Sequence, residues 1–315
     1  MIRFLLAAIV AASPAAALEL SLPVDCDMDG DCYIQSYPDR DVSNGYKDYS
    51  CNGMSYDGHK GLDIRVPSLD RLNQGVDILA AAPGQVRAIR DGEPDTGIED
   101  YAKGKDCGNA VVILHSDGWE TQYCHMKRGS IAVTKGQIVD TGDVLGRMGL
   151  SGRTAFPHLH LSVRHRGRHI DPFNSVSLDT RCGVKRRGMW TAKAAEALQY
   201  RGGGIVDAGL ASRPVELEEV REKGTALTTT GRDAMLLWAR FYGLRKGDVM
   251  SLDLTGPSGF EAKNNVTFDR NRAEHMLYAG KKTRNGWATG TYTGIAKLIR
   301  DGQVHDQEIV TLTVE

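Results

Sequence analysis

The chain has 315 residues, 41% of them hydrophobic and 25% charged, and its formal net charge is −1. This is the composition of an ordinary globular protein, and the near-neutral charge excludes a strongly basic chain that binds nucleic acid or an anionic membrane surface. The length favours two domains. Thirty-six glycines against six phenylalanines and four tryptophans indicate many tight turns, which favours β structure.

The first 17 residues have the pattern of a secretory signal peptide. Arg3 supplies a positive charge, residues 4–12 are an apolar core too short to span a bilayer, and residues 15–17 are three alanines at a cleavage site. We therefore expect an exported protein, periplasmic or secreted, that begins at Leu18. No later run approaches 18 uninterrupted apolar residues, so no transmembrane anchor is expected.

Six cysteines follow, and all of them precede residue 183. An even number in an exported chain predicts three disulfides, for which 15 pairings exist. We expect Cys107 to pair with Cys124 because a hairpin brings them into one region, and we leave the pairing of the other four open. No two of the six form a C-x-x-C pair, so a zinc site made of cysteines is not expected. The six are Cys26, Cys32, Cys51, Cys107, Cys124 and Cys182.

Residues 76–163 read as short strands and turns without a helix. The segment NAVVILHSDGWETQYCHM consists of two strand-like runs around Asp117-Gly118, which is a strong hairpin signal.

The segment MWTAKAAEALQY, residues 189–200, is the best helix candidate, and the glycines at 202–204 follow it like a linker. Beyond them, five segments read as short strands and predict a sandwich: AMLLWARFY, DVMSLDLTG, EHMLYAG, ATGTYTGIAKLIRDGQ and QEIVTLTVE. We expect an all-β chain with residues 18–182 as one domain, 183–208 as a helix and linker, and 209–315 as an immunoglobulin-like β-sandwich.

The segment FPHLHLSV holds two histidines on one strand face. Successive side chains of a strand point to opposite faces, so His158 and His160 share one face while Leu159 and Leu161 face the core. Taken alone, this pattern also fits two partly buried structural histidines.

The segment DGHKGLDIRV supplies a histidine and a carboxylate at a spacing that also places them on one face of an extended chain. His59 and Asp63 project to one side of an extended chain, and Gly61 leaves room between them. Two histidines and one carboxylate are the ligand set of a catalytic zinc, which keeps a fourth position for water. Manganese and cobalt accept the same donors, so they remain alternatives.

The segment ETQYCHM adds Tyr123 and His125, which an ideal strand places on one face. Beside a metal-activated water, His125 and the spare histidine of the H-x-H pair suit general acid–base catalysis.

Four motifs together resemble the lysostaphin-type, LytM-like zinc metallopeptidases, in the order in which that family has them. In chain order they are GHKGLD, YCH, VTKGQIVDTGDVLGRMG and GLSGRTAFPHLHLSV, and the resemblance covers residues 58–172. It implies an antiparallel β-sheet domain of the duplicated hybrid motif type and a peptidoglycan endopeptidase with one zinc ion per chain.

The resemblance also implies residue roles. The H-x-x-x-D motif of the family falls on His59 and Asp63, and the second histidine of its H-x-H motif falls on His160, so these three are the implied zinc ligands. His125 and His158 are the implied catalytic residues, which orient the water, act as a base or stabilise the oxyanion. The family often has an acidic residue where Ser162 stands, and we expect this departure to tune the site.

The expected function is therefore that of an exported zinc metalloendopeptidase, which hydrolyses stem or cross-bridge peptides of peptidoglycan through a zinc-activated water. The alternative is a non-catalytic cell-wall scaffold or amidase activator, a class marked by lost ligands. The C-terminal sandwich is a candidate surface for a cell-wall protein partner. The N-terminal extension, residues 26–56, either walls the substrate groove or covers it as a latency segment.

Overall fold

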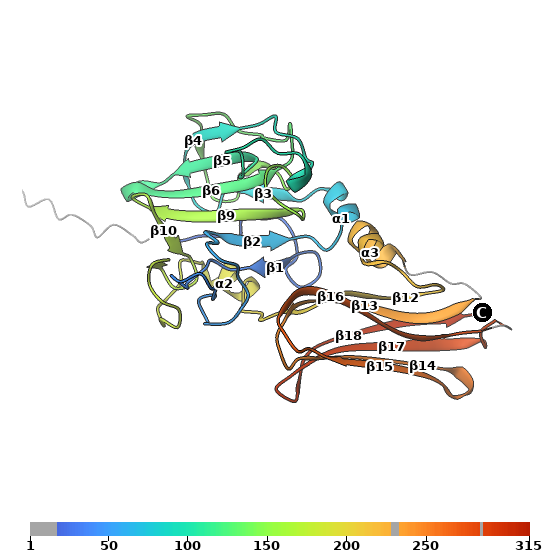
Figure 1. Cartoon of the computed structure of the whole chain (residues 1–315). Helices are drawn as coiled ribbons and strands as arrows, with labels where there is room; N and C mark the ends of the chain where they lie inside the picture. The colour runs from blue at the N-terminus through green and yellow to red at the C-terminus, as the bar shows by residue number, and fades with distance from the viewer. Residues whose placement is uncertain (1–17, 228–232, 284–285) are drawn as a thin grey trace, which may run out of the picture.

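The computed structural model describes residues 18–227, 233–283 and 286–315, and the predicted signal peptide lies outside these ranges. Figure 1 shows two β-rich bodies, one from each half of the chain, that lie side by side. Every strand pair in the described residues is antiparallel, which confirms the all-β fold class.

The first body contains α1 (Leu69–Gln74), α2 (Ala192–Ala197) and the short 3₁₀ turns η1 (Gly97–Glu99) and η2 (Ser116–Gly118). Its strands are β1 (Tyr33–Ser36), β2 (Leu62–Arg65), β3 (Asp77–Leu79), β4 (Gly84–Arg90), β5 (Asn109–Leu114), β6 (Trp119–Met126), β7 (Ile138–Val139), β8 (Val144–Arg147), β9 (His158–His165), β10 (Arg168–Asp171) and β11 (Val176–Ser177).

The second body contains α3 (Leu217–Lys223) and the turns η3 (Gly224–Leu227) and η4 (Pro257–Gly259). Its strands are β12 (Gly204–Ala211), β13 (Ala234–Leu244), β14 (Val249–Gly256), β15 (Phe260–Thr267), β16 (Arg272–Lys282), β17 (Gly290–Arg300) and β18 (Gln303–Val314).

The large sheet of the first body has the order β1-β2-β9-β6-β5-β4-β7, and β10 joins it through β9. Strand β9 runs through its centre between β2 and β6 (Figure 1). Leu159 and Leu161 are fully buried in the core, as their alternation with the two histidines predicts.

The hairpin of β5 and β6 turns at Asp117 and Gly118, which have φ angles of 54° and 80°. These positive values explain why the turn takes Asp-Gly, since glycine and aspartate tolerate this conformation best. The predicted hairpin is therefore confirmed.

The N-terminal extension is part of the first body. Strand β1 pairs with β2 at the edge of the large sheet, and Arg40 forms a fully buried ion pair with Asp171, 2.8 Å apart. The disulfide Cys51–Cys182 ties the extension to the end of the domain. The other two disulfides are Cys107–Cys124, as predicted, and Cys26–Cys32.

The helix predicted over residues 189–200 is shorter, because α2 spans only Ala192–Ala197. The predicted linker is also shorter, because β12 already begins at Gly204. Gly203 passes close to Gly243, where a Cβ would lie 2.6 Å from the Gly243 carbonyl oxygen. Gly203 therefore serves close backbone packing, and the sandwich begins five residues before the predicted boundary at 209.

The second body is a sandwich of two antiparallel sheets, β12-β13-β16 and β15-β14-β17-β18. Side chains such as Leu237 and Leu252, both fully buried, fill the space between the sheets. Seven strands in this sequence order form the immunoglobulin-like sandwich that the sequence predicts. The fourth strand, β15, pairs with the third, β14. Strands β12 and β15 were not predicted, and β15 buries only Ala262.

The helices of the described residues are six or seven residues long. None of the helices in the described residues is long and apolar enough to cross a bilayer.

The Cys51–Cys182 bridge should stabilise the fold more than the Cys26–Cys32 bridge does. The two bridges close loops with sequence separations of 131 and 6 residues, and a longer loop loses more entropy in the unfolded chain. We expect Cys51→Ser/Cys182→Ser to cost roughly 4–5 kcal/mol and Cys26→Ser/Cys32→Ser about 2 kcal/mol. Urea unfolding of both double variants checks this, and equal midpoints would contradict it.

Candidate metal centre

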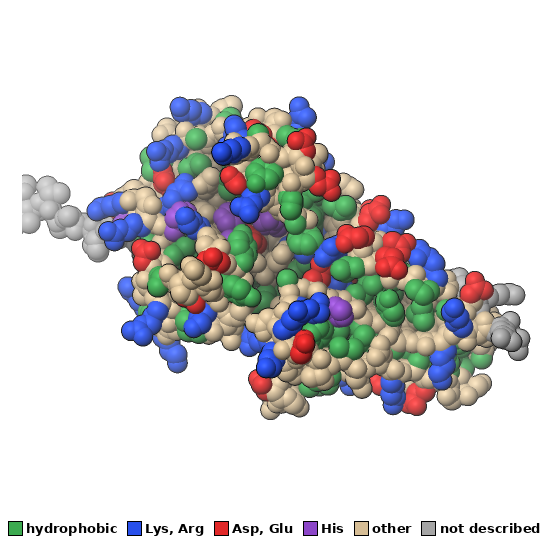
Figure 2. Space-filling view, in the orientation of Figure 1, with side chains coloured by type: hydrophobic (Ala, Val, Ile, Leu, Met, Phe, Trp, Pro, Cys, Tyr) green, Lys and Arg blue, Asp and Glu red, His purple; other side chains and the backbone are tan. Residues whose placement is uncertain are grey.

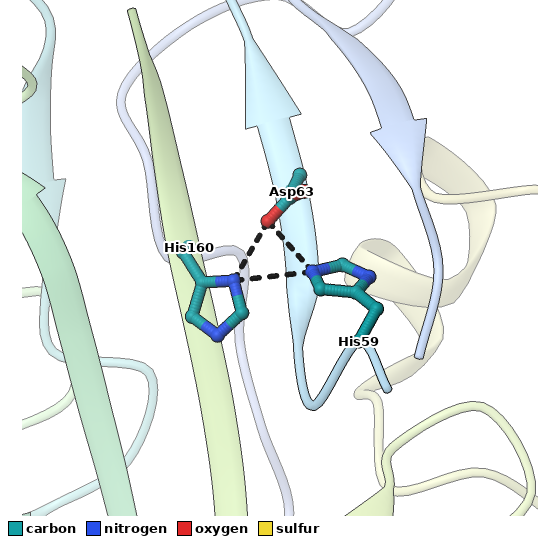
Figure 3. Close-up of side chains that lie close together, drawn as sticks. All are labelled: His59, Asp63 and His160. Atoms are coloured by element: carbon teal, nitrogen blue, oxygen red, sulfur yellow. Dashed lines mark hydrogen bonds and ion pairs between the residues drawn. The ribbon is translucent and has the colours of Figure 1, made fainter. Parts of the chain in front are cut away.

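The pairing of β2 with β9 creates the centre of the site. Asp63 on β2 lies directly opposite His160 on β9, and His59 lies in the loop just before β2. Figure 3 shows the three side chains turned toward one another. Residues almost a hundred positions apart in the sequence therefore meet because two short strands pair in this register.

The three side chains present one donor atom each to a common point. Nε2 of His59 lies 3.0 Å from Oδ1 of Asp63 and 3.2 Å from Nδ1 of His160, and that Nδ1 lies 2.8 Å from the same Oδ1. Donors placed about 2.0–2.1 Å from a tetrahedral zinc ion are about 3.3 Å apart. The donor set therefore fits a zinc ion if the three donor atoms move slightly apart.

The contacts on the far side of each imidazole set its tautomer. Nδ1 of His59 lies 2.8 Å from the Tyr37 carbonyl oxygen, so it carries the proton and leaves Nε2 with a free lone pair. The Ser162 hydroxyl donates to the Lys60 carbonyl oxygen, so it accepts from Nε2 of His160 at 3.1 Å. Nδ1 of His160 is then free to bind a metal.

Gly61 lies directly against the ring of His160, so the room that the glycine leaves is filled by this ligand. A Cβ at this position would come within 2.5 Å of the His160 Nε2 atom and 2.7 Å of the Leu161 carbonyl oxygen. Any larger side chain would push His160 away from the donor cluster.

His125 and His158 lie beside this cluster, with their ring centroids 4.6 Å apart. His125 donates from Nδ1 to the Ser151 carbonyl oxygen at 2.8 Å. His158 lies with Nδ1 2.8 Å from the Phe156 carbonyl oxygen, and its Nε2 is 3.4 Å from Oδ1 of Asp63. The structure thus brings all five predicted residues together, with Nδ1 of both extra imidazoles held by backbone.

The placement of Tyr123 with His125 on one face was wrong. Tyr123 is fully buried, and its hydroxyl accepts a hydrogen bond from the Ala81 backbone. His125 has a φ angle of 60°, which interrupts the alternation of the strand and turns its side chain into the groove next to Cys124. A positive φ at a histidine leaves no signal in the sequence.

Burial and neighbouring charges separate the pKa values of the histidines. Burial alone raises the pKa of Asp63, but His59 and His158 outweigh it, and the pKa lies well below the usual range. Burial, with the nearby His158 and His160, lowers the pKa of His125 far below that of a free imidazole. Burial also lowers the pKa of His158, but Asp63 reverses this and leaves it raised. His125 is therefore the neutral imidazole, and His158 is the more basic one.

A groove of about 660 Å³ opens beside the cluster, and His125 and His160 are among its lining residues. Figure 2 shows histidine side chains at the bottom of a hollow on the first body, with Lys and Arg side chains around it. The N-terminal extension ends at this groove, where Tyr56 stacks on His59 with 4.2 Å between the ring centroids. Tyr56 of the extension therefore lines the groove, and Tyr56 and the Tyr37 carbonyl are site features that the sequence did not reveal.

Residues 57–172 match the sequence profile of Peptidase family M23. This match lies in the first body and confirms the predicted resemblance to the lysostaphin-type peptidases.

Two curated relatives illustrate the similarity. The chain is 39% identical over 110 residues to DD-carboxypeptidase/endopeptidase Mpg of Neisseria meningitidis serogroup B, which covers 35% of this chain and 24% of that protein. It is 34% identical over 139 residues to peptidoglycan DD-endopeptidase ShyA of Vibrio cholerae serotype O1. This match covers 44% of this chain and 28% of that protein. The match spans about a quarter of the length of these relatives.

Among solved structures, a zinc-containing peptidase from Vibrio cholerae is 26% identical, with a TM-score of 0.29, and the match covers 44% of this chain and 38% of that chain. The catalytic domain of a mutant of the prophage-encoded M23 protein EnpA from Enterococcus faecalis is 26% identical with a TM-score of 0.31, covering 44% and 85%.

Removal of one proposed ligand should abolish metal binding. We expect the protein to bind one zinc ion per chain and His160→Ala to bind none, because two remaining donors hold zinc poorly. His165→Ala is the matched control, since His165 lies on the same strand and stacks on Trp119 away from the cluster. Elemental analysis after dialysis checks this, and bound zinc in the His160→Ala protein would contradict the assignment.

Gly61→Ala should weaken zinc binding although it removes no ligand. The added methyl group would displace His160, and disturbing the support of a ligand typically costs 10–100-fold in affinity, so we expect a loss of at least about tenfold. Gly30→Ala is the control because a Cβ there meets nothing within 4 Å. Competition with a chromophoric chelator measures both affinities, and an unchanged affinity in Gly61→Ala would refute the role of the glycine.

Proposed function

We propose that the chain is an exported zinc metalloendopeptidase that hydrolyses stem or cross-bridge peptides of peptidoglycan. The observation that carries this proposal is the convergence of His59, Asp63 and His160 on one point beside an open groove that His160 lines, with two further imidazoles next to them. The match to Peptidase family M23 and the names of the relatives support the reaction and the substrate.

In this proposal the three donors hold the metal and the two other histidines move protons. A zinc ion with an open position lowers the pKa of water to about 7 and polarises a scissile carbonyl group. His125, neutral because of burial and with Nε2 free, accepts the proton of the attacking water. His158, whose Nε2 lies 3.4 Å from Oδ1 of Asp63, stabilises the oxyanion or donates a proton to the leaving amine.

The three disulfides support export, because such bonds persist in oxidising compartments. A periplasmic or secreted location therefore belongs to the proposal. A protein partner for the C-terminal sandwich stays a prediction.

The proposal predicts the products of a digest of purified sacculi. The full chain should release fragments from cross-linked muropeptides, His160→Ala should release none, and His125→Ala and His158→Ala should be slower by about 10²–10⁴-fold. His165→Ala again serves as the control and should match the wild type. Mass spectrometry of the fragments identifies the bond that is cut.

A protein that binds zinc but cuts no muropeptide would refute peptidoglycan as the substrate. A protein that neither cuts nor binds zinc would favour the alternative, a non-catalytic scaffold or amidase activator.

A further inference from the structure

Phe156 lies where the C-terminal sandwich meets the metal centre. The Cζ atom of Arg65 lies 3.9 Å from the centroid of the Phe156 ring, and the Cζ atom of Arg221 lies 4.8 Å from it. Arg65 belongs to β2 of the peptidase domain, whereas Arg221 belongs to α3 of the second body. One aromatic ring is therefore held by guanidinium groups from both bodies, each at a distance typical of a cation–π contact.

Glu274 of β16 joins these cations into one network. Its carboxylate accepts a hydrogen bond from Nε of Arg221 at 3.0 Å and one from Arg240 at 3.3 Å, and it lies 4.0 Å from Arg65. The side chain of Glu274 is only 8% exposed and that of Arg221 is 23% exposed, so the carboxylate at the centre of the network is shielded from solvent. Glu274 thereby fixes the position of Arg221 over Phe156.

The backbone of Phe156 passes this constraint to the site. Its carbonyl oxygen accepts hydrogen bonds from Nδ1 of His158 at 2.8 Å and from the Thr154 hydroxyl at 2.6 Å. His158 also lies directly opposite Arg65 in the pairing of β2 with β9. The orientation of the His158 ring therefore depends on where the Phe156 carbonyl is held.

A second anchor, which shares Glu274 with this network through Arg240, joins the two bodies without touching Phe156. Arg240 donates to the Pro67 carbonyl oxygen at 2.6 Å and forms two hydrogen bonds with Asp207, at 3.0 and 2.7 Å. Both side chains are at least 95% buried. The bodies therefore stay attached when Arg221 is replaced, and its contact with Phe156 can be tested on its own.

We propose that the C-terminal sandwich is a working part of the peptidase centre, in which Arg221 and Glu274 fix Phe156 and thereby orient His158. Arg221, Glu274 and Phe156 are positioning residues, since they act through His158 and do not reach the donor cluster. This role rests on the proposed function. It gives the sandwich a task within the chain that requires no external partner.

The test compares Arg221→Ala with Arg221→Lys and with the control Arg213→Ala. Arg213 pairs with Glu219 of α3, so the control removes an arginine–glutamate pair of the same helix that does not involve Phe156. In the full chain we expect Arg221→Ala to lower kcat on a soluble cross-linked muropeptide about tenfold, with KM and bound zinc unchanged. Arg221→Lys should restore part of kcat, because lysine keeps the cation over the ring.

A second measurement does not require activity. Nδ1–H of His158, hydrogen-bonded to the Phe156 carbonyl, gives a downfield imidazole proton resonance in NMR spectra, assigned by its loss in His158→Ala. It should shift or disappear in Arg221→Ala and stay in place in Arg213→Ala. An unchanged kcat with an unchanged resonance would overturn the proposal, and so would a loss of zinc or of folding in Arg221→Ala.

These readouts separate the two proposals. If the wild-type chain cuts no muropeptide, the proposed function fails, and the resonance alone decides whether α3 positions His158. If the chain is active and the resonance does not respond to Arg221→Ala, only the role of the sandwich fails.

Discussion

The register in which β9 pairs with β2 and β6 is the constraint on which the site depends. It places His160 opposite Asp63 on one side and opposite Cys124 on the other. A slip of one residue would exchange the two faces of β9 and would bury the histidines while exposing Leu159 and Leu161. The free energy of burying these leucines therefore also fixes the geometry of the donor cluster.

The site is held rigid by a hydrogen bond to one ring nitrogen of each imidazole. A backbone carbonyl holds Nδ1 of His59, His125 and His158, and the Ser162 hydroxyl holds Nε2 of His160. Such contacts fix both the tautomer and the direction of each ring before a ligand arrives. The carbonyl on His59 belongs to Tyr37 of the N-terminal extension, so the extension supports the centre whose groove Tyr56 lines.

The backbone around His125 is constrained in the same way. Its amide donates to the Cys107 carbonyl oxygen at 2.9 Å, and the disulfide Cys107–Cys124 closes the same loop. A residue at positive φ persists only where its surroundings determine it, and here a disulfide and a hydrogen bond do so. In the proposed acid–base pair, the Cys107–Cys124 loop therefore supports His125, and the C-terminal sandwich supports His158 through Phe156.

Much of the candidate site could be predicted because its signals are local. The H-x-H alternation follows from the period of a strand. The spacing of His59 and Asp63, with a glycine between them, is an equally local pattern, although His59 lies in the loop before β2. The Asp-Gly turn likewise reports a local backbone conformation.

The remaining features come from contacts that no local pattern records. The Tyr37 carbonyl, the ring of Phe156 and the reach of Arg221 depend on how distant segments pack. Strand β15 was missed for a related reason: it lies at a sheet edge with mostly polar residues, so it lacks a clear apolar alternation.

X-ray absorption at the zinc edge tests the central claim most directly, because it reports the ligands without requiring activity. For the zinc-loaded full chain, the account predicts two imidazole nitrogens with oxygen ligands at about 2.0–2.1 Å and no sulfur. In His160→Ala, zinc should be absent or bound by fewer imidazoles. Sulfur at about 2.3 Å, or a zinc environment unchanged in His160→Ala, would contradict the account.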